Sequence, residues 1–156
     1  MKQKLFLKCA NQILTKNNKA DPKVTHCELC EVGKKWLERK GYVVAFSELR
    51  NILMHQHPDV IGWSCRGVSC LIEVKISRSD YNRDAKKPHV ISPTVGKSRY
   101  YLVPKGLIKP CEIRDGWGLL EYDGKRVHKT VDSPEHLKRS VNDECAMLVY
   151  ALRNRR

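Results

Sequence analysis

Two carboxylates and a lysine stand close together within two short apolar runs. Asp59 follows Pro58 and opens the run VIGW, while Glu73 and Lys75 interrupt the second run, SCLIEVKI. Charged groups in an apolar strand are costly unless they are paired or bind an ion. Carboxylate oxygens are the ligands that Mg²⁺ and Mn²⁺ prefer. The spacing therefore indicates a divalent-cation site with Asp59 and Glu73 as ligands.

The geometry of the two strands decides whether these side chains can meet. Side chains alternate between the faces of a strand, so Glu73 and Lys75 share one face. A three-residue loop, Arg66-Gly67-Val68, would place Asp59 opposite Lys75 on that face, whereas a two-residue loop would turn Asp59 away. The site therefore requires an odd-length turn or a compensating bulge between residues 65 and 69.

A cation held by Asp59 and Glu73 would support phosphodiester hydrolysis. It would lower the pKa of a bound water and neutralise charge that develops on a phosphate. Lys75 beside it could orient the attacking water or stabilise the transition state. The structural alternative is a salt-bridged cluster at a sheet edge, because an ion pair between Glu73 and Lys75 would by itself account for two charges in one strand.

The charge of the chain favours a polyanionic partner. Its 156 residues include 30 Lys and Arg against 17 Asp and Glu, a formal net charge of +13. An excess of this size, spread along the sequence, is typical of proteins that bind DNA or RNA. The basic residues that follow the Glu73–Lys75 strand are the candidate phosphate contacts: Arg78, Arg83, Lys86 and Lys87.

The elements that must position these residues follow from hydrophobic periodicity and capping signals. Thr25 with Glu28 and Ser77 with Asp80 form capping boxes that open two helices. Ser133 and Pro134 predict the start of a final helix, whose apolar positions would be Leu137, Val141, Cys145, Leu148 and Leu152. The predicted order is helix 4–15, helix 24–41, strands 42–49, 59–64 and 69–76, helix 77–87, strand 99–104, a hairpin over 116–131 turning at Asp123-Gly124, and helix 134–153. This order indicates one domain with a mixed α/β sheet flanked by helices.

The motif resembles the PD-(D/E)xK nuclease superfamily. The matching residues are Pro58-Asp59 followed by Glu73-Val74-Lys75, after a helix and a strand. The segment LIEVKISRSDYNRDAKKP is also similar to MmcB-like DNA-repair proteins and small prophage-encoded relatives, in which the E-x-K strand runs into a Ser/Asp-rich basic helix. The likeness covers roughly residues 26 to 122. It implies a restriction-endonuclease-like αβββαβ core with an extra C-terminal hairpin and helix, and Mg²⁺- or Mn²⁺-dependent cleavage of DNA or RNA in repair, recombination or phage DNA processing.

The resemblance also assigns roles to individual residues. Asp59 and Glu73 would be metal ligands, the backbone carbonyl of Val74 a further ligand, and Lys75 the catalytic lysine. Many members add a Glu from the first helix, for which Glu28, Glu31 and Glu48 of the following strand are candidates. Glu31 is preferred because its distance from Gly41 is closer to the usual spacing, and because Glu28 already has a capping role.

The sequence is also compatible with other functions and binding sites. The scaffold could bind nucleic acid without cleaving it, or act as a phage-encoded protein-interaction factor. Tyr81, Tyr100 and Tyr101 could stack on unpaired bases, although strand aromatics more often belong to a core. Cys27-x2-Cys30 and Cys65-x4-Cys70 would make a zinc site only if all four thiols met around one ion.

The cysteine count bears on the compartment. Seven Cys without a recognisable signal peptide indicate reduced thiols in a cytosol-like compartment. The resemblance implies that this compartment is the cytoplasm of a bacterial or phage-infected cell.

Overall fold

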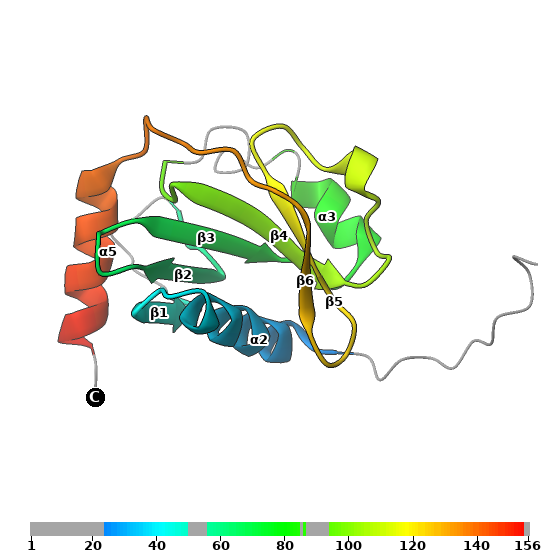
Figure 1. Cartoon of the computed structure of the whole chain (residues 1–156), viewed down its shortest axis with the longest axis horizontal. Helices are drawn as coiled ribbons and strands as arrows, with labels where there is room; N and C mark the ends of the chain where they lie inside the picture. The colour runs from blue at the N-terminus through cyan, green and yellow to red at the C-terminus, as the bar shows by residue number, and fades with distance from the viewer. Residues whose placement is uncertain (1–23, 50–55, 85, 87–93, 155–156) are drawn as a thin grey trace, which may run out of the picture.

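A six-stranded mixed sheet forms the centre of the protein (Figure 1). The computed structural model describes residues 24–49, 56–84, 86 and 94–154. The strands lie side by side in chain order: β1 (Val44–Ser47), β2 (Val60–Trp63), β3 (Ser69–Val74), β4 (Ser98–Pro104), β5 (Gly118–Tyr122) and β6 (Val127–Val131). β3, β4 and β5 are parallel, and the other neighbours are antiparallel.

Three helices flank the sheet: α2 (His26–Arg39), α3 (Arg78–Asp84) and α5 (Val141–Arg153). A short 3-10 helix, η1 (Pro110–Glu112), lies between β4 and β5. The predicted mixed α/β fold is confirmed, and from α2 to β4 the elements follow the order αβββαβ. The predicted helix 4–15 lies outside the described residues. No helix in the described part of the chain is long and apolar enough to cross a membrane.

α2 covers one face of the sheet. Its first turn is closed by the predicted capping box, in which the Thr25 hydroxyl accepts from Glu28 N and the Glu28 carboxylate accepts from Thr25 N. The helix buries Leu29, Cys30 and Leu37 among the side chains of β2, β3 and β4 that face it. The opposite face packs against α3 through Tyr81 and against α5 through Met147. α3 and α5 lie at opposite ends of the sheet (Figure 1).

The turn between β2 and β3 has the odd length that the site requires. Ser64 N donates to the Val68 carbonyl at 2.9 Å, so the loop consists of residues 65–67, one residue earlier than expected. Val60 pairs with Ile72 and Trp63 with Ser69. Continuing this register by one residue places Asp59 opposite Glu73 and not opposite Lys75. The expected parity is confirmed, and the predicted partner of Asp59 was wrong by two residues.

The C-terminal helix begins at Val141, not at residue 134. Ser140 is its cap and accepts from Asp143 N at 3.2 Å. The Ser133 hydroxyl accepts instead from Arg99 N at 2.8 Å, at the start of β4. Backbone N–H groups of His136 and Ser140 donate to the carbonyls of Lys97 and Thr94. These N–H groups are bonded to the chain that leads into β4, so residues 132–140 run beside it as an irregular segment with a turn at residues 137–138.

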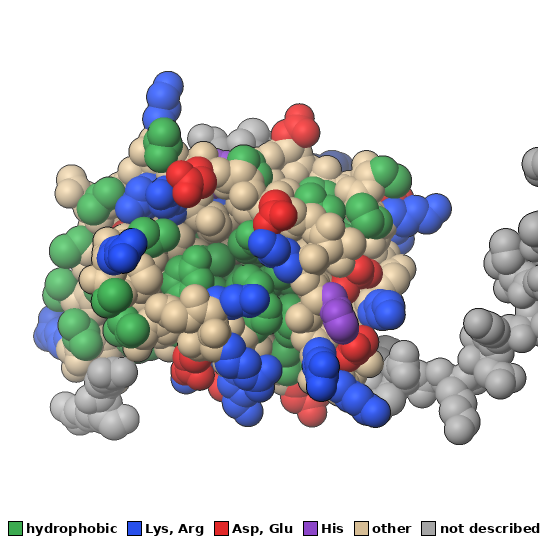
Figure 2. Space-filling view, in the orientation of Figure 1, with side chains coloured by type: hydrophobic (Ala, Val, Ile, Leu, Met, Phe, Trp, Pro, Cys, Tyr) green, Lys and Arg blue, Asp and Glu red, His purple; other side chains and the backbone are tan. Residues whose placement is uncertain are grey.

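α5 also turns a different face to the core than its periodicity suggested. Glu144, Met147 and Ala151 are its buried residues. The Glu144 carboxylate accepts from the Ser69 hydroxyl at 2.7 Å and from Gly96 N at 2.9 Å. These bonds to a buried carboxylate fix the rotation of the helix. Three residues of the predicted apolar stripe are exposed as a result, namely Val141, Cys145 and Leu152, and hydrophobic side chains gather along the α5 edge of the surface (Figure 2). Leu137, which precedes the helix, is exposed as well.

Substitutions on the two faces of α5 test this orientation. Met147 is 1% exposed and Val149 is 60% exposed. We expect Met147→Ala to lower the free energy of unfolding by about 2–4 kcal/mol, because it leaves a cavity in the core. Val149→Ala on the same helix should change it by no more than about 0.5 kcal/mol. Urea denaturation followed by circular dichroism measures both, and equal losses would contradict the observed rotation.

Candidate active site

A buried lysine surrounded by three carboxylates lies at one end of the sheet. Lys75 Nζ is 3.5 Å from Glu73 Oε2, 3.5 Å from Asp84 Oδ2 and 4.0 Å from Asp59 Oδ2. Glu73 and Lys75 are each 3% exposed. With all four groups ionised, the cluster carries a net charge of −2. The structure thus brings together the three residues of the predicted motif and adds a fourth.

Asp59 lies where the start of β2 meets the end of β3. Its Oδ2 accepts from Val74 N at 2.8 Å, which fixes the carboxylate between the two strands. Its backbone carbonyl accepts from Glu48 N at 2.7 Å. Glu48 has a φ of +51°, in the left-handed region that non-glycine residues seldom adopt. Asp59 is therefore held by both its side chain and its backbone.

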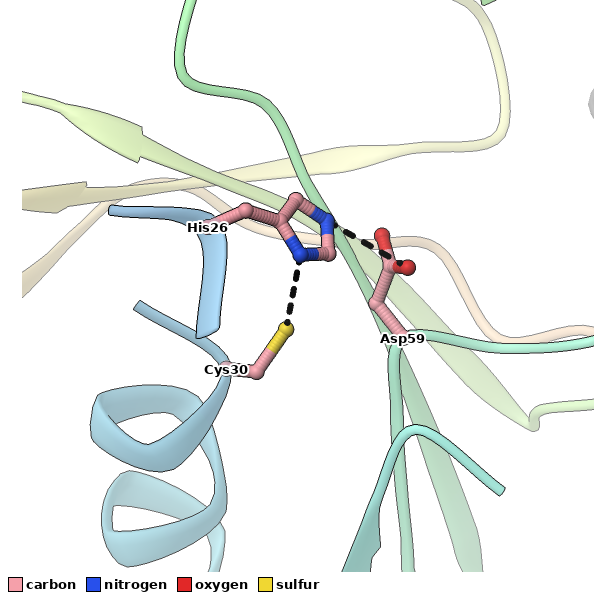
Figure 3. A group of neighbouring side chains, drawn as sticks. All are labelled: His26, Cys30 and Asp59. Atoms are coloured by element: carbon pink, nitrogen blue, oxygen red, sulfur yellow. Dashed lines mark hydrogen bonds and ion pairs between the residues drawn. The ribbon is translucent and has the colours of Figure 1, made fainter. Parts of the chain in front are cut away.

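The second oxygen of Asp59 faces α2. Asp59 Oδ1 is 3.5 Å from His26 Nε2, and His26 Nδ1 is 3.6 Å from Cys30 Sγ (Figure 3). Each of the three residues has a potential ligand atom within 4.8 Å of the others. In the described part of the chain, this is the one group of three or more His, Cys, Asp or Glu that meets this distance.

The structure does not place the expected helix Glu in that position. The Glu28 carboxylate accepts from Thr25 at the helix cap, and the Glu31 carboxylate accepts from the Ser47 hydroxyl. The Glu48 carboxylate lies 3.9 Å from the Cys27 thiol, which donates to it. Among the described residues, His26 is the α2 side chain that pairs with Asp59. The sequence signal for it was its spacing of four from Cys30, which puts both on one helix face.

Asp84 is the second residue that the motif did not reveal. It is fully buried, and its Oδ2 accepts from the Tyr101 hydroxyl at 3.4 Å as well as contacting Lys75. Asp84 follows Tyr81 by three residues, so both lie on the face of α3 that packs on the sheet. Arg78 and Arg83, which were predicted as phosphate contacts, are exposed on the same helix.

Burial and charge shift the ionisation of the central pair. Burial, together with the charge of Asp59, raises the pKa of Glu73 to about 8. Burial acts to lower the pKa of Lys75, but Glu73, Asp84 and Asp59 outweigh it, and the net shift is upward. Glu73 Oε1 is buried and receives no hydrogen bond from the described residues. A buried acceptor without a donor fits a cation ligand, and the oxygen donors here match Mg²⁺ or Mn²⁺.

The predicted phosphate contacts differ in their availability. Arg78 is bound to the Glu112 carboxylate through two nitrogens and also donates to the Leu107 carbonyl. Arg83 and Lys86 are exposed. Lys87 lies outside the described residues. The three tyrosines considered for base stacking are buried: Tyr81, Tyr100 and Tyr101.

A groove of about 830 Å³ runs beside the site. Its lining includes the first turns of α2 and residues that follow β3 and β4, among them Cys27, Glu31, Lys35, Ile76 and Lys105. Glu31 therefore faces the open space of the groove, on the same helix as His26 and Cys30, where it can meet a ligand.

The predicted four-cysteine zinc site does not form. Cys65 lies in the β2–β3 turn, six residues from Asp59 and hence about 20 Å along the strand from it.

Comparison with known proteins gives a fold relationship. No family model and no curated protein matches the chain. A solved structure of a protein of unknown function from Silicibacter pomeroyi matches with a TM-score of 0.57 and 23% identity. The match covers 81% of this chain and 89% of that one. The likeness establishes a shared fold.

The buried Glu73 carboxyl should give the metal-free protein a distinctive pH dependence. Since its pKa is raised, folding favours its protonated form. The free energy of unfolding should then fall as pH rises from about 5 to about 8, by roughly 3–4 kcal/mol, since one proton bound in the folded state alone changes it by about 1.4 kcal/mol per pH unit. Glu73→Gln removes this decline, so in EDTA at the alkaline end the variant should be at least as stable as the parent. Thermal denaturation at several pH values measures the effect.

Glu38→Gln is the matched control, since Glu38 is an exposed carboxylate on α2. This variant should keep the parent's decline. A Glu73→Gln variant that loses stability equally at every pH would show that Glu73 is folded in its ionised form.

Proposed function

We propose that this protein is a Mg²⁺- or Mn²⁺-dependent nuclease of the PD-(D/E)xK type. The observation that carries the proposal is the cluster of Asp59, Glu73 and Lys75 at the end of β3. A plain structural ion pair would balance its charges, whereas this cluster has three carboxylates around one ammonium. The αβββαβ order agrees with the resemblance of the sequence motif.

Asp59, Glu73 and the Val74 carbonyl would hold the ion in this scheme. The bound ion supplies a water of lowered pKa and neutralises charge on the phosphate. Lys75 acts as a hydrogen-bond donor because its raised pKa keeps the ammonium protonated. It would orient the attacking water and stabilise charge on the reacting phosphate. Asp84 positions Lys75 from α3.

DNA or RNA is the proposed substrate. The formal charge of +13 supports a polyanion, and Arg83 and Lys86 are exposed on and just after α3, which also carries Asp84. Phosphate contacts from this helix would hold a strand beside Lys75. Processes that such a nuclease would serve are DNA repair, recombination or phage DNA processing, in a cytoplasmic setting.

Two substitutions test the chemistry. We expect Asp59→Asn and Lys75→Ala each to reduce cleavage at least about 100-fold, because one removes a ligand and the other the cationic donor. The assay uses Mg²⁺ or Mn²⁺ with plasmid, single-stranded, branched and RNA substrates. EDTA should abolish cleavage by the parent.

Asp115→Asn and Lys138→Ala are the matched controls, since both residues are exposed. They should leave cleavage unchanged. Binding without cleavage of any substrate by the parent would favour a non-cleaving nucleic-acid-binding module. Absence of binding at low salt would leave a protein-interaction role.

A binding experiment tests the substrate surface separately. The double variant Arg83→Ala/Lys86→Ala should weaken binding and reduce the slope of log K against log salt by about 1–2, because each lost phosphate contact removes close to one released counterion. Arg66→Ala/Lys138→Ala removes one exposed Arg and one exposed Lys away from α3 and should leave the slope unchanged. Fluorescence anisotropy over a salt series measures both. Identical slopes for the two double variants would argue against α3 as the contact.

A further inference from the structure

The face of Asp59 turned toward α2 carries a set of ligands unlike the oxygen donors around Glu73. His26 offers an imidazole nitrogen, Cys30 a thiol sulfur and Asp59 a carboxylate oxygen. Mg²⁺ takes hard oxygen ligands, whereas nitrogen and sulfur donors suit Zn²⁺ and Co²⁺. We propose that His26, Cys30 and Asp59 form a second metal site, selective for a thiophilic transition metal such as Zn²⁺.

The spacing of the donors supports this assignment. Tetrahedral Zn²⁺ with ligand bonds of about 2.0–2.3 Å keeps its ligand atoms about 3.3–3.8 Å apart. Asp59 Oδ1 lies 3.5 Å from His26 Nε2 and Cys30 Sγ lies 3.6 Å from His26 Nδ1, so the two short contacts use different ring nitrogens. With one atom taken from each residue, the three ligand atoms lie within 4.8 Å of one another, so a small movement of the side chains would bring them to the spacing around a bound ion. The imidazole lies between the thiol and the carboxylate and is half-buried, so rotation of its ring can turn one nitrogen toward an ion between them (Figure 3). The fourth position is left for water.

The three residues are held by separate elements that the fold brings to one point. His26 and Cys30 are four residues apart in the first turns of α2, and the Thr25–Glu28 capping box fixes where that helix begins. Asp59 is fixed from the strand side by Val74 N. A site assembled in advance costs less conformational entropy when the ion binds.

Charge also favours a cation here. Burial, together with the carboxylates of Asp59, Glu48 and Glu31, raises the pKa of the Cys30 thiol. A divalent ion would be stabilised by the same carboxylates and would displace the thiol proton.

Asp59 would be a ligand in both metal sites, the one on the α2 side and the catalytic one beside Glu73. The shared ligand rests on the proposed function. Its Oδ1 faces His26, while its Oδ2 faces Lys75 and Val74 N. A thiophilic ion on the α2 side and a catalytic ion on the β3 side would therefore share one carboxylate. The α2 position would influence the charge that Asp59 presents to the catalytic ion.

Cobalt substitution tests the site without any activity measurement. Co²⁺ added to the full chain under reducing conditions should give a sulfur-to-cobalt charge-transfer band and the visible bands of tetrahedral cobalt, and the charge-transfer band should saturate at one thiolate-bound ion per chain. Cys30→Ser should abolish the charge-transfer band. Zn²⁺ should displace Co²⁺ and remove both sets of bands.

Two further variants keep the outcome interpretable. Because Cys30 is buried, its replacement can disturb folding, so His26→Asn at the half-exposed position is measured too. We expect it to weaken Zn²⁺ binding, measured by competition with a colorimetric chelator, at least about tenfold. Cys27→Ser is the matched control one turn earlier on α2 and should keep the band.

Three results would overturn the inference. These are absence of the band in the parent, a band unchanged in folded Cys30→Ser, and equal loss in Cys27→Ser, which would assign the ion to a Cys27–Cys30 pair. The readout is independent of nuclease activity. A protein that binds cobalt and cleaves nothing would refute the proposed function and keep this site, and an active nuclease with no band would do the reverse.

Discussion

The hydrogen bond from Val74 N to Asp59 Oδ2 holds together the end of the sheet that carries the Lys75 cluster. It joins the start of β2 to the end of β3, beyond the last paired residues of the two strands. The bond leaves Oδ1 facing His26 on α2 and keeps Oδ2 near Lys75. Without it, the Asp59 carboxylate would have no hydrogen bond to β3, although the Asp59 carbonyl would still accept from Glu48 N. The three-residue β2–β3 turn is what gives the strands the register in which this bond can form.

The balance of charges around Lys75 distinguishes this cluster from an ordinary buried ion pair. A buried pair offsets much of its desolvation cost when each charge has one partner of opposite sign. Here Glu73, Asp84 and Asp59 surround a single ammonium, and one buried oxygen of Glu73 receives no hydrogen bond from the part of the chain that the structure describes. The folded protein compensates by raising the pKa of Glu73, so that a proton neutralises it. The proposed divalent cation would neutralise the same excess charge without the proton.

The sequence allowed prediction of those parts of the site that depend on local rules. Alternation along β3 places Glu73 and Lys75 on one face, and a capping box marks the start of α2. His26 and Asp84 were not predicted as part of the site, because their contacts depend on how α2 and α3 pack on the sheet, which no local spacing determines. The predicted start and buried face of the C-terminal helix were wrong for a related reason. Ser133 had a cap-like context but bonds to β4, and buried Glu144 set a rotation that apolar periodicity contradicted.

The site is acidic in a protein that is strongly basic overall. Lys and Arg exceed Asp and Glu by 13 along the chain, yet four carboxylates, those of Asp59, Glu73, Asp84 and Glu31, lie in or next to the region around β3 and α2. A polyanion attracted by the basic surface would be repelled at this point, since like charges in a partly desolvated site interact strongly. A cation bound between the carboxylates would reverse the local sign. Metal binding and phosphate binding at this end of the sheet should therefore favour each other, because each removes the electrostatic cost that the other meets.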